Sequence, residues 1–194
     1  MSKQARAVKT CLKPVHRLFV AIRPPEEVRD LLIDAMDYGA DFRWQGDEQL
    51  HLTLRFIGEV ERPVADDLAT ALSHIRGGRF QLRINGAGRF EQRNSGALWA
   101  GVEPKAPVAA LAEKAERVCQ QIGLEPEGRA FHPHITLARW KGRRGREVAD
   151  FLERTRGLSS EPFEVTEFIL FESQLSRHGA HYEPAATYPL DWPS

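Results

Sequence analysis

The chain is expected to form one mixed α/β domain with helices packed outside strands. Strand-like and helix-like segments follow one another along all 194 residues, and no spacer rich in Gly, Ser or Pro divides them. A hydrophobic content of 42% is enough to bury one core in a chain of this length. A His-x-Thr string occurs at 51–53 and again at 134–136, which indicates a loose internal duplication into two lobes.

The chain is expected to begin with a flexible tail at 1–16, which is followed by a single domain at 17–194. Glu26 and Glu27 directly follow Pro24-Pro25, and these residue types favour the positive N-terminal end of a helix. The elements predicted in the first half are a strand at 17–22, a helix opened by Pro24-Pro25, a strand at 50–57 ended by Gly58, and a helix from Pro63 to Gly77-Gly78.

The second half is richer in short strands, because turn-forming Gly, Asn and Ser residues separate its apolar runs. Its basic run Lys141–Arg146 is expected to be a loop. The elements predicted in this half are short strands at 80–84, 88–91 and 97–102, a helix at 107–122, a strand at 131–139, a helix at 147–154, and strands at 163–172 and 182–188.

Composition excludes several classes of protein. With 27 basic and 27 acidic residues, the chain lacks the concentrated positive charge that coats duplex nucleic acid. It has no apolar run long enough for a membrane span. Two cysteines, Cys11 and Cys119, are too few for a disulfide framework and form no metal-binding pair. We therefore expect a cytoplasmic monomer that does not bind membranes.

Strand alternation gives each His-x-Thr string a buried face and a polar face. The predicted faces are Leu52, Leu54 and Phe56 buried with His51, Thr53 and Arg55 polar in the first string, and Ile135 and Leu137 buried with His132, His134 and Thr136 polar in the second. Two imidazoles suit displacement at phosphorus, which needs one base and one acid, since histidine titrates near about pH 6.5. The hydroxyls of Thr53 and Thr136 are expected to bind non-bridging phosphate oxygens, and no metal or other cofactor is required.

Two other kinds of site are open at this stage. A metal-dependent phosphohydrolase would use the pairs His132/His134 and His178/His181 as ligands, although no carboxylate accompanies either pair in a recognised spacing. A non-catalytic module would bind a nucleotide end with the same residues. Survival of activity in EDTA and the effect of histidine substitutions on rate separate these alternatives.

The strings and their flanks resemble a known family. His51-Leu-Thr-Leu-Arg-Phe-Ile-Gly58 and His132-Pro-His-Ile-Thr-Leu-Ala-Arg139 are similar to the paired signatures of the two-histidine (2H) phosphoesterases. Within that superfamily, the chain resembles the RNA 2',3'-cyclic phosphodiesterases, also called 2'-5' RNA ligases. The likeness extends from the strand at 17–22 through Leu98–Val102 to Tyr182.

The resemblance implies a bilobal fold, in which two pseudo-symmetric lobes of antiparallel sheet with outer helices surround a central cleft. It implies that His51 is the general acid on the departing 3' oxygen, and that His134 is the base that activates water. The substrates would be RNA ends with a 2',3'-cyclic phosphate, the product a 2'-phosphate, and ligation the reverse reaction. The phosphate-binding arginine of the family falls on Arg139, although simple alternation predicts that Arg139 faces away from His134.

Aromatic and basic residues near the strings are candidates for contact with RNA. Phe56 can stack on a base, but its alternation predicts core packing instead. Trp44, Phe90 and Tyr182 are stacking candidates if they reach the cleft. The basic loop Lys141–Arg146 can guide an RNA end by charge.

Overall fold

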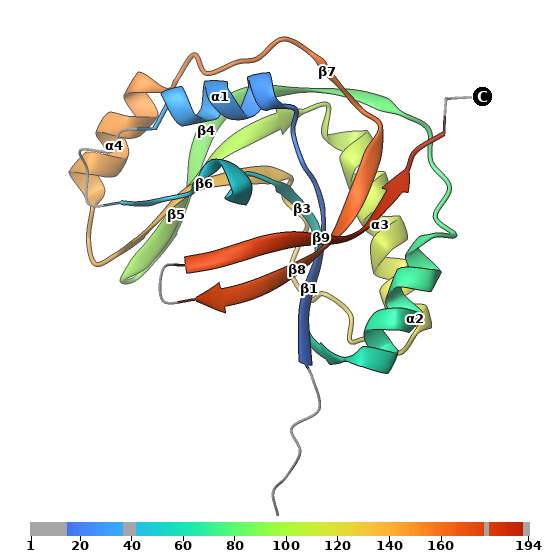
Figure 1. Cartoon of the computed structure of the whole chain (residues 1–194). Helices are drawn as coiled ribbons and strands as arrows, with labels where there is room; N and C mark the ends of the chain where they lie inside the picture. Colours follow the sequence, from blue (N-terminus) through green and yellow to red (C-terminus); the bar gives the residue numbers. More distant parts are fainter. Residues whose placement is uncertain (1–14, 37–41, 177–178, 192–194) are drawn as a thin grey trace, which may run out of the picture.

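The structure, a computed structural model, describes residues 15–36, 42–176 and 179–191. The elements in chain order are β1 (Val15–Ile22), α1 (Glu26–Asp34), β2 (Arg43–Trp44), the short 3-10 helix η1 (Asp47–Gln49), β3 (Leu52–Glu61), α2 (Arg62–Leu72), β4 (Phe80–Gln92), β5 (Ser95–Glu103), α3 (Lys105–Gln121), β6 (His134–Lys141), α4 (Gly145–Arg154), β7 (Phe163–Val165), β8 (Glu167–Ser176) and β9 (Gly179–Pro189). This content confirms the mixed α/β class (Figure 1). Within the described part of the chain, no helix is long and apolar enough to cross a membrane.

The strands form one antiparallel sheet whose spatial order is β7-β4-β5-β6-β3-β1-β8-β9, with β2 paired to β6. The two strands that carry the His-x-Thr strings, β3 and β6, are therefore neighbours at its centre. One lobe consists of β4 to β7 and the other of β1, β3, β8 and β9. The lobes are thus not the two halves of the chain, because the C-terminal hairpin β8–β9 returns to pair with β1 (Figure 1).

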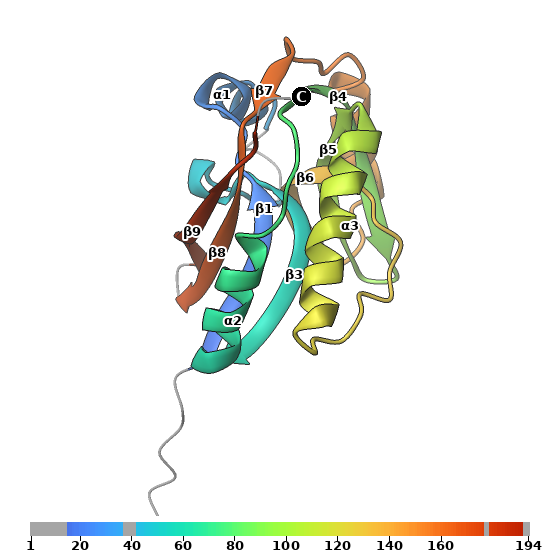
Figure 2. The same cartoon turned by 90° about the vertical axis from the view of Figure 1, so that its right-hand side faces the viewer.

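In the described part of the chain, α1 to α4 all contribute to one large hydrophobic core on one face of the sheet. Their buried residues include Val28 and Leu32 of α1, Leu68 and Leu72 of α2, Val108 and Leu111 of α3, and Val148 and Phe151 of α4. Helices α2 and α3 lie side by side at one end of this face (Figures 1 and 2). A smaller cluster of Phe19, Ala21, Ile169 and Phe171 lies on the opposite side of β1 and β8. We call the two sides the helix-covered face and the open face.

Several predicted boundaries were wrong where glycines permit a strand to continue. Gly58 does not end β3; it has a φ of 84° and sits where the pairing with β1 shifts, so the strand runs on to Glu61. The strands expected at 80–84 and 88–91 are one strand, β4, which accommodates a similar shift near Gly86. The strand expected at 163–172 is divided into β7 and β8.

Smaller differences occur at the ends of other elements. Strand β1 begins at Val15, so the last two residues of the expected tail belong to the sheet, and residues 1–14 lie outside the described residues. Helix α2 ends at Leu72, before Gly77-Gly78. Strand β6 begins only at His134, because the residues from 124 to 133 form an extended loop that crosses from α3.

Candidate active site

The two His-x-Thr strings meet at the centre of the sheet. Strands β3 and β6 are joined by one antiparallel pair, Leu52 opposite Ile135, which are the residues between His and Thr in each string. Both side chains are buried on the helix-covered face, at 1% and 0% exposure. Alternation therefore turns His51, Thr53, His134 and Thr136 to the open face, where the two strings are related by an approximate two-fold axis.

A β-bulge follows the threonine in each string and changes which residues reach the open face. Thr53 pairs with Ala21 but Arg55 pairs with Val20, so Leu54 is the extra residue in β3. Thr136 pairs with Trp99 but Ala138 pairs with Leu98, so Leu137 is the extra residue in β6. Beyond each bulge the alternation is reversed.

This reversal corrects three predictions. Arg139 pairs with Ala97 and faces the same side as His134 and Thr136, so the alternation that pointed it away was misleading. Arg55 is buried on the helix-covered face, where a polar position had been predicted. Phe56, expected in the core, lies opposite Phe19 on the open face with 39% of its surface exposed.

His51 is fixed by a backbone carbonyl and by aromatic rings. Its Nδ1 lies 2.8 Å from the carbonyl oxygen of Gln49, which can only accept, so Nδ1 carries the hydrogen and Nε2 is left to exchange a proton. Gln49 is itself held in place because its side-chain amide donates to the carbonyl of Ala180 in β9, at 2.6 Å. The rings of Phe19 and Tyr182 flank the imidazole at 4.8 and 5.2 Å between centroids.

His134 has the same arrangement in the other lobe. Its Nδ1 donates to the carbonyl of His132 at 2.6 Å, again two residues earlier in the chain, and again leaves Nε2 to exchange a proton. Phe90 stands edge-on to the imidazole at 4.8 Å, and Trp99 lies 6.2 Å away. The two histidines are therefore held as the same tautomer by equivalent contacts.

Burial and positive charge lower the pKa of both imidazoles. Desolvation is the main cause at His51, whose pKa falls from 6.5 to about 4, and the charges of His134 and Arg139 lower it further. The pKa of His134 is also lowered, chiefly by desolvation and then by the charges of His132 and Arg139. The structure thus brings His51, His134 and Arg139 close enough for their charges to interact, and both histidines are neutral at pH 7 while no anion is bound.

The threonine hydroxyls complete the predicted set. Thr53 and Thr136 are half-buried beside the histidines. Among the described residues, neither hydroxyl has a hydrogen-bond partner, which leaves both available to a bound oxygen. Each lobe thus presents one hydroxyl and one imidazole whose Nε2 can exchange a proton, with Arg139 beside them.

The metal alternative gains no support from the described residues. At 15–36, 42–176 and 179–191, no group of three or more His, Cys, Asp or Glu side chains is arranged to hold a metal ion. His134 uses Nδ1 for the carbonyl of His132, and His181 lies 3.4 Å from Glu183. His178 lies outside the described residues.

The stacking candidates divide into two groups. Tyr182 and Phe90 contact the two histidines directly, so they reach the site. Trp44 instead packs on Phe42 and on Phe151 of α4, and belongs to the core. Phe19, Phe171 and Trp99 were missed in the sequence, because they come from β1, β8 and β5 and only the sheet order brings them to the histidines.

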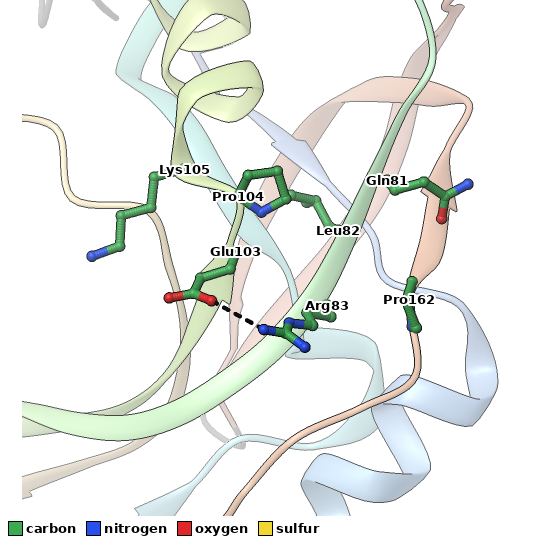
Figure 3. Close-up of a pocket in the computed structure, with 7 residues that line it drawn as sticks. All are labelled: Gln81, Leu82, Arg83, Glu103, Pro104, Lys105 and Pro162. Carbon is green, nitrogen blue, oxygen red and sulfur yellow. Dashed lines mark hydrogen bonds and ion pairs between the residues drawn. The ribbon is translucent and has the colours of Figure 1, made fainter.

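Concave surfaces elsewhere do not coincide with these residues. Figure 3 shows a pocket near the start of α3, where Arg83 pairs with Glu103 at 3.5 Å. Its lining residues are Gln81, Leu82, Arg83, Glu103, Pro104, Lys105 and Pro162. A second hollow lies between α2 and α3. Neither contains a residue predicted for the site.

Arg55 links the first string to the loop that leads to the second. Its guanidinium is 9% exposed, lies 2.5 Å from Glu116 of α3, and donates to the carbonyl of Glu125. Glu127 in the same loop lies 3.7 Å from Arg55. This loop continues to His132, whose carbonyl orients His134, so Arg55 has a structural role that alternation did not predict.

Replacing Arg55 by methionine is expected to lower the free energy of unfolding by about 3 kcal/mol. The change removes one partner of a largely buried ion pair and leaves Glu116 uncompensated. Urea denaturation followed by circular dichroism measures the effect. Arg83→Met is the matched control, because its pair with Glu103 is exposed and is worth less than about 1 kcal/mol. Equal losses in the two variants would show that the Arg55 pair has no special structural role.

Comparison with known proteins gives this site a family. Residues 23–177 match the profile of the 2'-5' RNA ligase superfamily. That range contains both strings and most of the chain, so the chain belongs to this superfamily. The membership confirms the resemblance seen in the two strings.

Individual relatives agree with this membership. The RNA 2',3'-cyclic phosphodiesterase of Aeropyrum pernix is 36% identical over 148 residues, which cover 75% of this chain and 84% of that protein. The Escherichia coli protein of the same name is 30% identical over 178 residues, covering 90% and 96%. Crystal structures of Escherichia coli LigT superpose with TM-scores of 0.75 for the apo form and 0.74 for the complex with 3'-AMP. The sequence identity is 28% for the apo form and 29% for the complex. Both alignments cover 91% of this chain, and they cover 98% and 99% of the LigT chain. The superpositions confirm the predicted bilobal fold.

Proposed function

We propose that this protein is an RNA 2',3'-cyclic phosphodiesterase that opens the cyclic phosphate at an RNA end to a 2'-phosphate. The observation that carries the proposal is the pairing of the two strings at Leu52 and Ile135, with both histidines held through Nδ1 by carbonyls. The two imidazoles have the same tautomer, and both Nε2 atoms lie on the open face. This arrangement fits a reaction that needs one base and one acid at a single phosphorus. Relatives named RNA 2',3'-cyclic phosphodiesterase support the choice of substrate.

In the proposed mechanism, the catalytic residues are His51 and His134. His134 takes a proton from water through Nε2, and the water oxygen forms a new bond to phosphorus. The bond from phosphorus to the 3' oxygen breaks, and protonated His51 gives its proton to that oxygen. Thr53, Thr136 and Arg139 bind the non-bridging oxygens, where negative charge is concentrated. If the 5' hydroxyl of another RNA takes the place of water, its oxygen bonds to phosphorus, the bond to the 3' oxygen breaks, and the same groups form a 2'-5' linkage.

Binding of the anionic substrate favours the protonated histidine that the reaction needs and that the free protein lacks. Burial makes neutral His51 the stable form, yet an acid must hold a proton. A bound phosphodiester carries a negative charge, which favours an imidazolium beside it. We therefore expect one histidine to take up a proton when the substrate binds.

The surroundings of the site fit a nucleotide. Tyr182 and Phe90 are placed beside the two histidines and are proposed to stack on bases, an interaction worth roughly 1–3 kcal/mol per base. The exposed basic residues Lys141, Arg143 and Arg146, at the end of β6 and the start of α4, are proposed to guide the RNA end by charge. The protein is proposed to act as a cytoplasmic monomer, without a metal or other cofactor.

Incubation with an RNA that ends in a 2',3'-cyclic phosphate tests the function directly. We expect hydrolysis at an unchanged rate in EDTA and a 2'-phosphate as the product, identified by chromatography against both phosphomonoester standards. Loss of activity in EDTA would favour the metal alternative. A 3'-phosphate product would contradict the roles given to His51 and His134, and binding without turnover would indicate a nucleotide-end binding module.

A further inference from the structure

A second arginine lies beside Arg139 at the edge of the site. Strand β2 pairs with β6 so that Arg43 is directly opposite Arg139, and side chains at opposite positions of an antiparallel pair point to the same face. The neighbours of Arg43 in the chain point the other way, since Phe42 is 8% exposed and Trp44 packs on Phe151. Arg43 is therefore exposed on the open face.

The two arginines occupy directly opposite positions of the strand pair, and among the described residues neither side chain has a carboxylate partner. Within the described residues, neither the Arg43 nor the Arg139 side chain forms an ion pair or a hydrogen bond. Like charges directly opposite each other destabilise a sheet. Several other arginines of this electrically neutral chain are paired, such as Arg29 with Asp47 at 2.7 Å. An unpaired couple of arginines at this position fits an anionic ligand that compensates both.

Arg43 is also held firmly, on the strand next to Arg139. The amide of Gln45 donates to the carbonyl of Leu137 at 2.8 Å, which fixes β2 against the bulge of the second string. The charge of Arg139 lowers the pKa of both His51 and His134, and Arg43 stands opposite Arg139 on the neighbouring strand. A ligand with one anionic group at the histidines and a second one further along β6 would contact both arginines.

We propose that Arg43 binds the phosphodiester on the 5' side of the nucleotide that carries the cyclic phosphate, so that the site prefers oligonucleotide ends to cyclic mononucleotides. This inference rests on the proposed function, because an RNA with a 3'-terminal cyclic phosphate continues only through its 5' oxygen. The next phosphate is then the nearest second anion in such a substrate, and a guanidinium is well suited to contact it with two hydrogen bonds.

Binding measurements test the role of Arg43 without requiring turnover. The ligands are a deoxyadenosine–adenosine dinucleotide with a terminal 2'-phosphate, the same molecule with an uncharged methylphosphonate linkage, and 2'-AMP. The proteins are the wild type, Arg43→Gln, and the matched control Arg117→Gln, which removes an exposed arginine from α3 on the helix-covered side. Isothermal titration calorimetry gives the affinities.

The wild type and Arg117→Gln are expected to bind the charged dinucleotide about tenfold more tightly than the methylphosphonate analogue. Arg43→Gln is expected to bind the two dinucleotides equally, with an unchanged affinity for 2'-AMP. The salt dependence of log affinity for the charged dinucleotide should also fall by about 0.7 in slope. A preserved tenfold preference in Arg43→Gln, or no preference in the wild type, would overturn the inference.

Turnover separates this inference from the proposed function. With a dinucleotide that ends in a 2',3'-cyclic phosphate, Arg43→Gln should lower kcat/KM about tenfold, and kcat/KM for 2',3'-cyclic AMP should not change. If the wild type hydrolyses neither substrate, the proposed function fails, whereas the binding preference still decides whether Arg43 contacts the 5' phosphate.

Discussion

Replacing either His51 or His134 by alanine is expected to lower kcat for cyclic phosphate hydrolysis by about 10²–10⁴-fold. Each substitution removes an Nε2 that exchanges a proton in the transition state, and that atom is free to do so because a carbonyl fixes the hydrogen on Nδ1. The affinity for a product dinucleotide should change far less, because Thr53, Thr136 and Arg139 still bind its phosphate. Steady-state kinetics and calorimetry measure the two quantities.

The double variant, with both His51 and His134 replaced by alanine, should be little less active than the less active of the two single variants, because the two histidines act as a unit. His132→Ala is the matched control. It removes an exposed imidazole but keeps the carbonyl that holds His134, so kcat should stay close to the wild-type value. A loss in His132→Ala as large as that in His134→Ala would point to metal ligation by this pair.

Sequence patterns correctly gave the shared face of His and Thr in each string, but they did not show what surrounds these residues. The strings at 51–53 and 134–136 define a local pattern, and the side chains i and i+2 of a strand share a face whatever lies beside it. The tertiary structure was needed to pair the strings through Leu52 and Ile135. The carbonyls of Gln49 and His132 are equally hidden in sequence, because a backbone acceptor carries no residue signature.

Alternation failed at the residues just beyond each string. Leu54 and Leu137 are ordinary strand residues, and nothing in their type marks them as the extra residue of a bulge. The bulge places Arg139 on the open face and Arg55 in the core, the opposite of what a regular strand would do. For Arg139 the family resemblance was therefore a better guide than periodicity, and it agrees with the register of β6.

The aromatic support of His51 illustrates a different limit. Phe19, Phe171 and Tyr182 come from β1, β8 and β9, which are distant in sequence and meet only because the C-terminal hairpin pairs with β1. The apparent duplication of the chain favoured two lobes made of consecutive halves. Two lobes of this kind would not bring β8 and β9 to the first string, so the sequence did not predict these contacts.

We expect kcat/KM to fall about tenfold for each pH unit above the higher of the two histidine pKa values in the free protein. Catalysis needs one protonated and one neutral imidazole, and kcat/KM reports the protonation of the free enzyme. Because the pKa of His51 is lowered to about 4 and that of His134 is also lowered, the decline should begin below pH 6.5. Rates measured from pH 4 to 9 with a dinucleotide substrate show where it begins.

The same measurement should give a different profile for kcat, which reports the enzyme–substrate complex. The bound phosphodiester favours the imidazolium, so the decline in kcat should occur at higher pH than that in kcat/KM. Calorimetry in buffers of different ionisation enthalpy should show net proton uptake when a 2'-phosphate product binds at pH 7. Identical profiles for kcat and kcat/KM, with no proton uptake, would show that the anion does not protonate the site.

Arg139→Gln provides an independent check on the cause of these shifts. The positive charge of Arg139 lowers the pKa of both histidines, so its removal should raise both values and move the decline in kcat/KM to higher pH. The variant should at the same time bind the phosphate less tightly, because a charged donor is lost. Arg117→Gln, which removes an exposed charge on the helix-covered side, should leave the profile where it is. A weaker affinity with an unmoved profile would mean that Arg139 binds the phosphate without tuning the histidines, and that desolvation alone keeps both imidazoles neutral until the RNA end arrives.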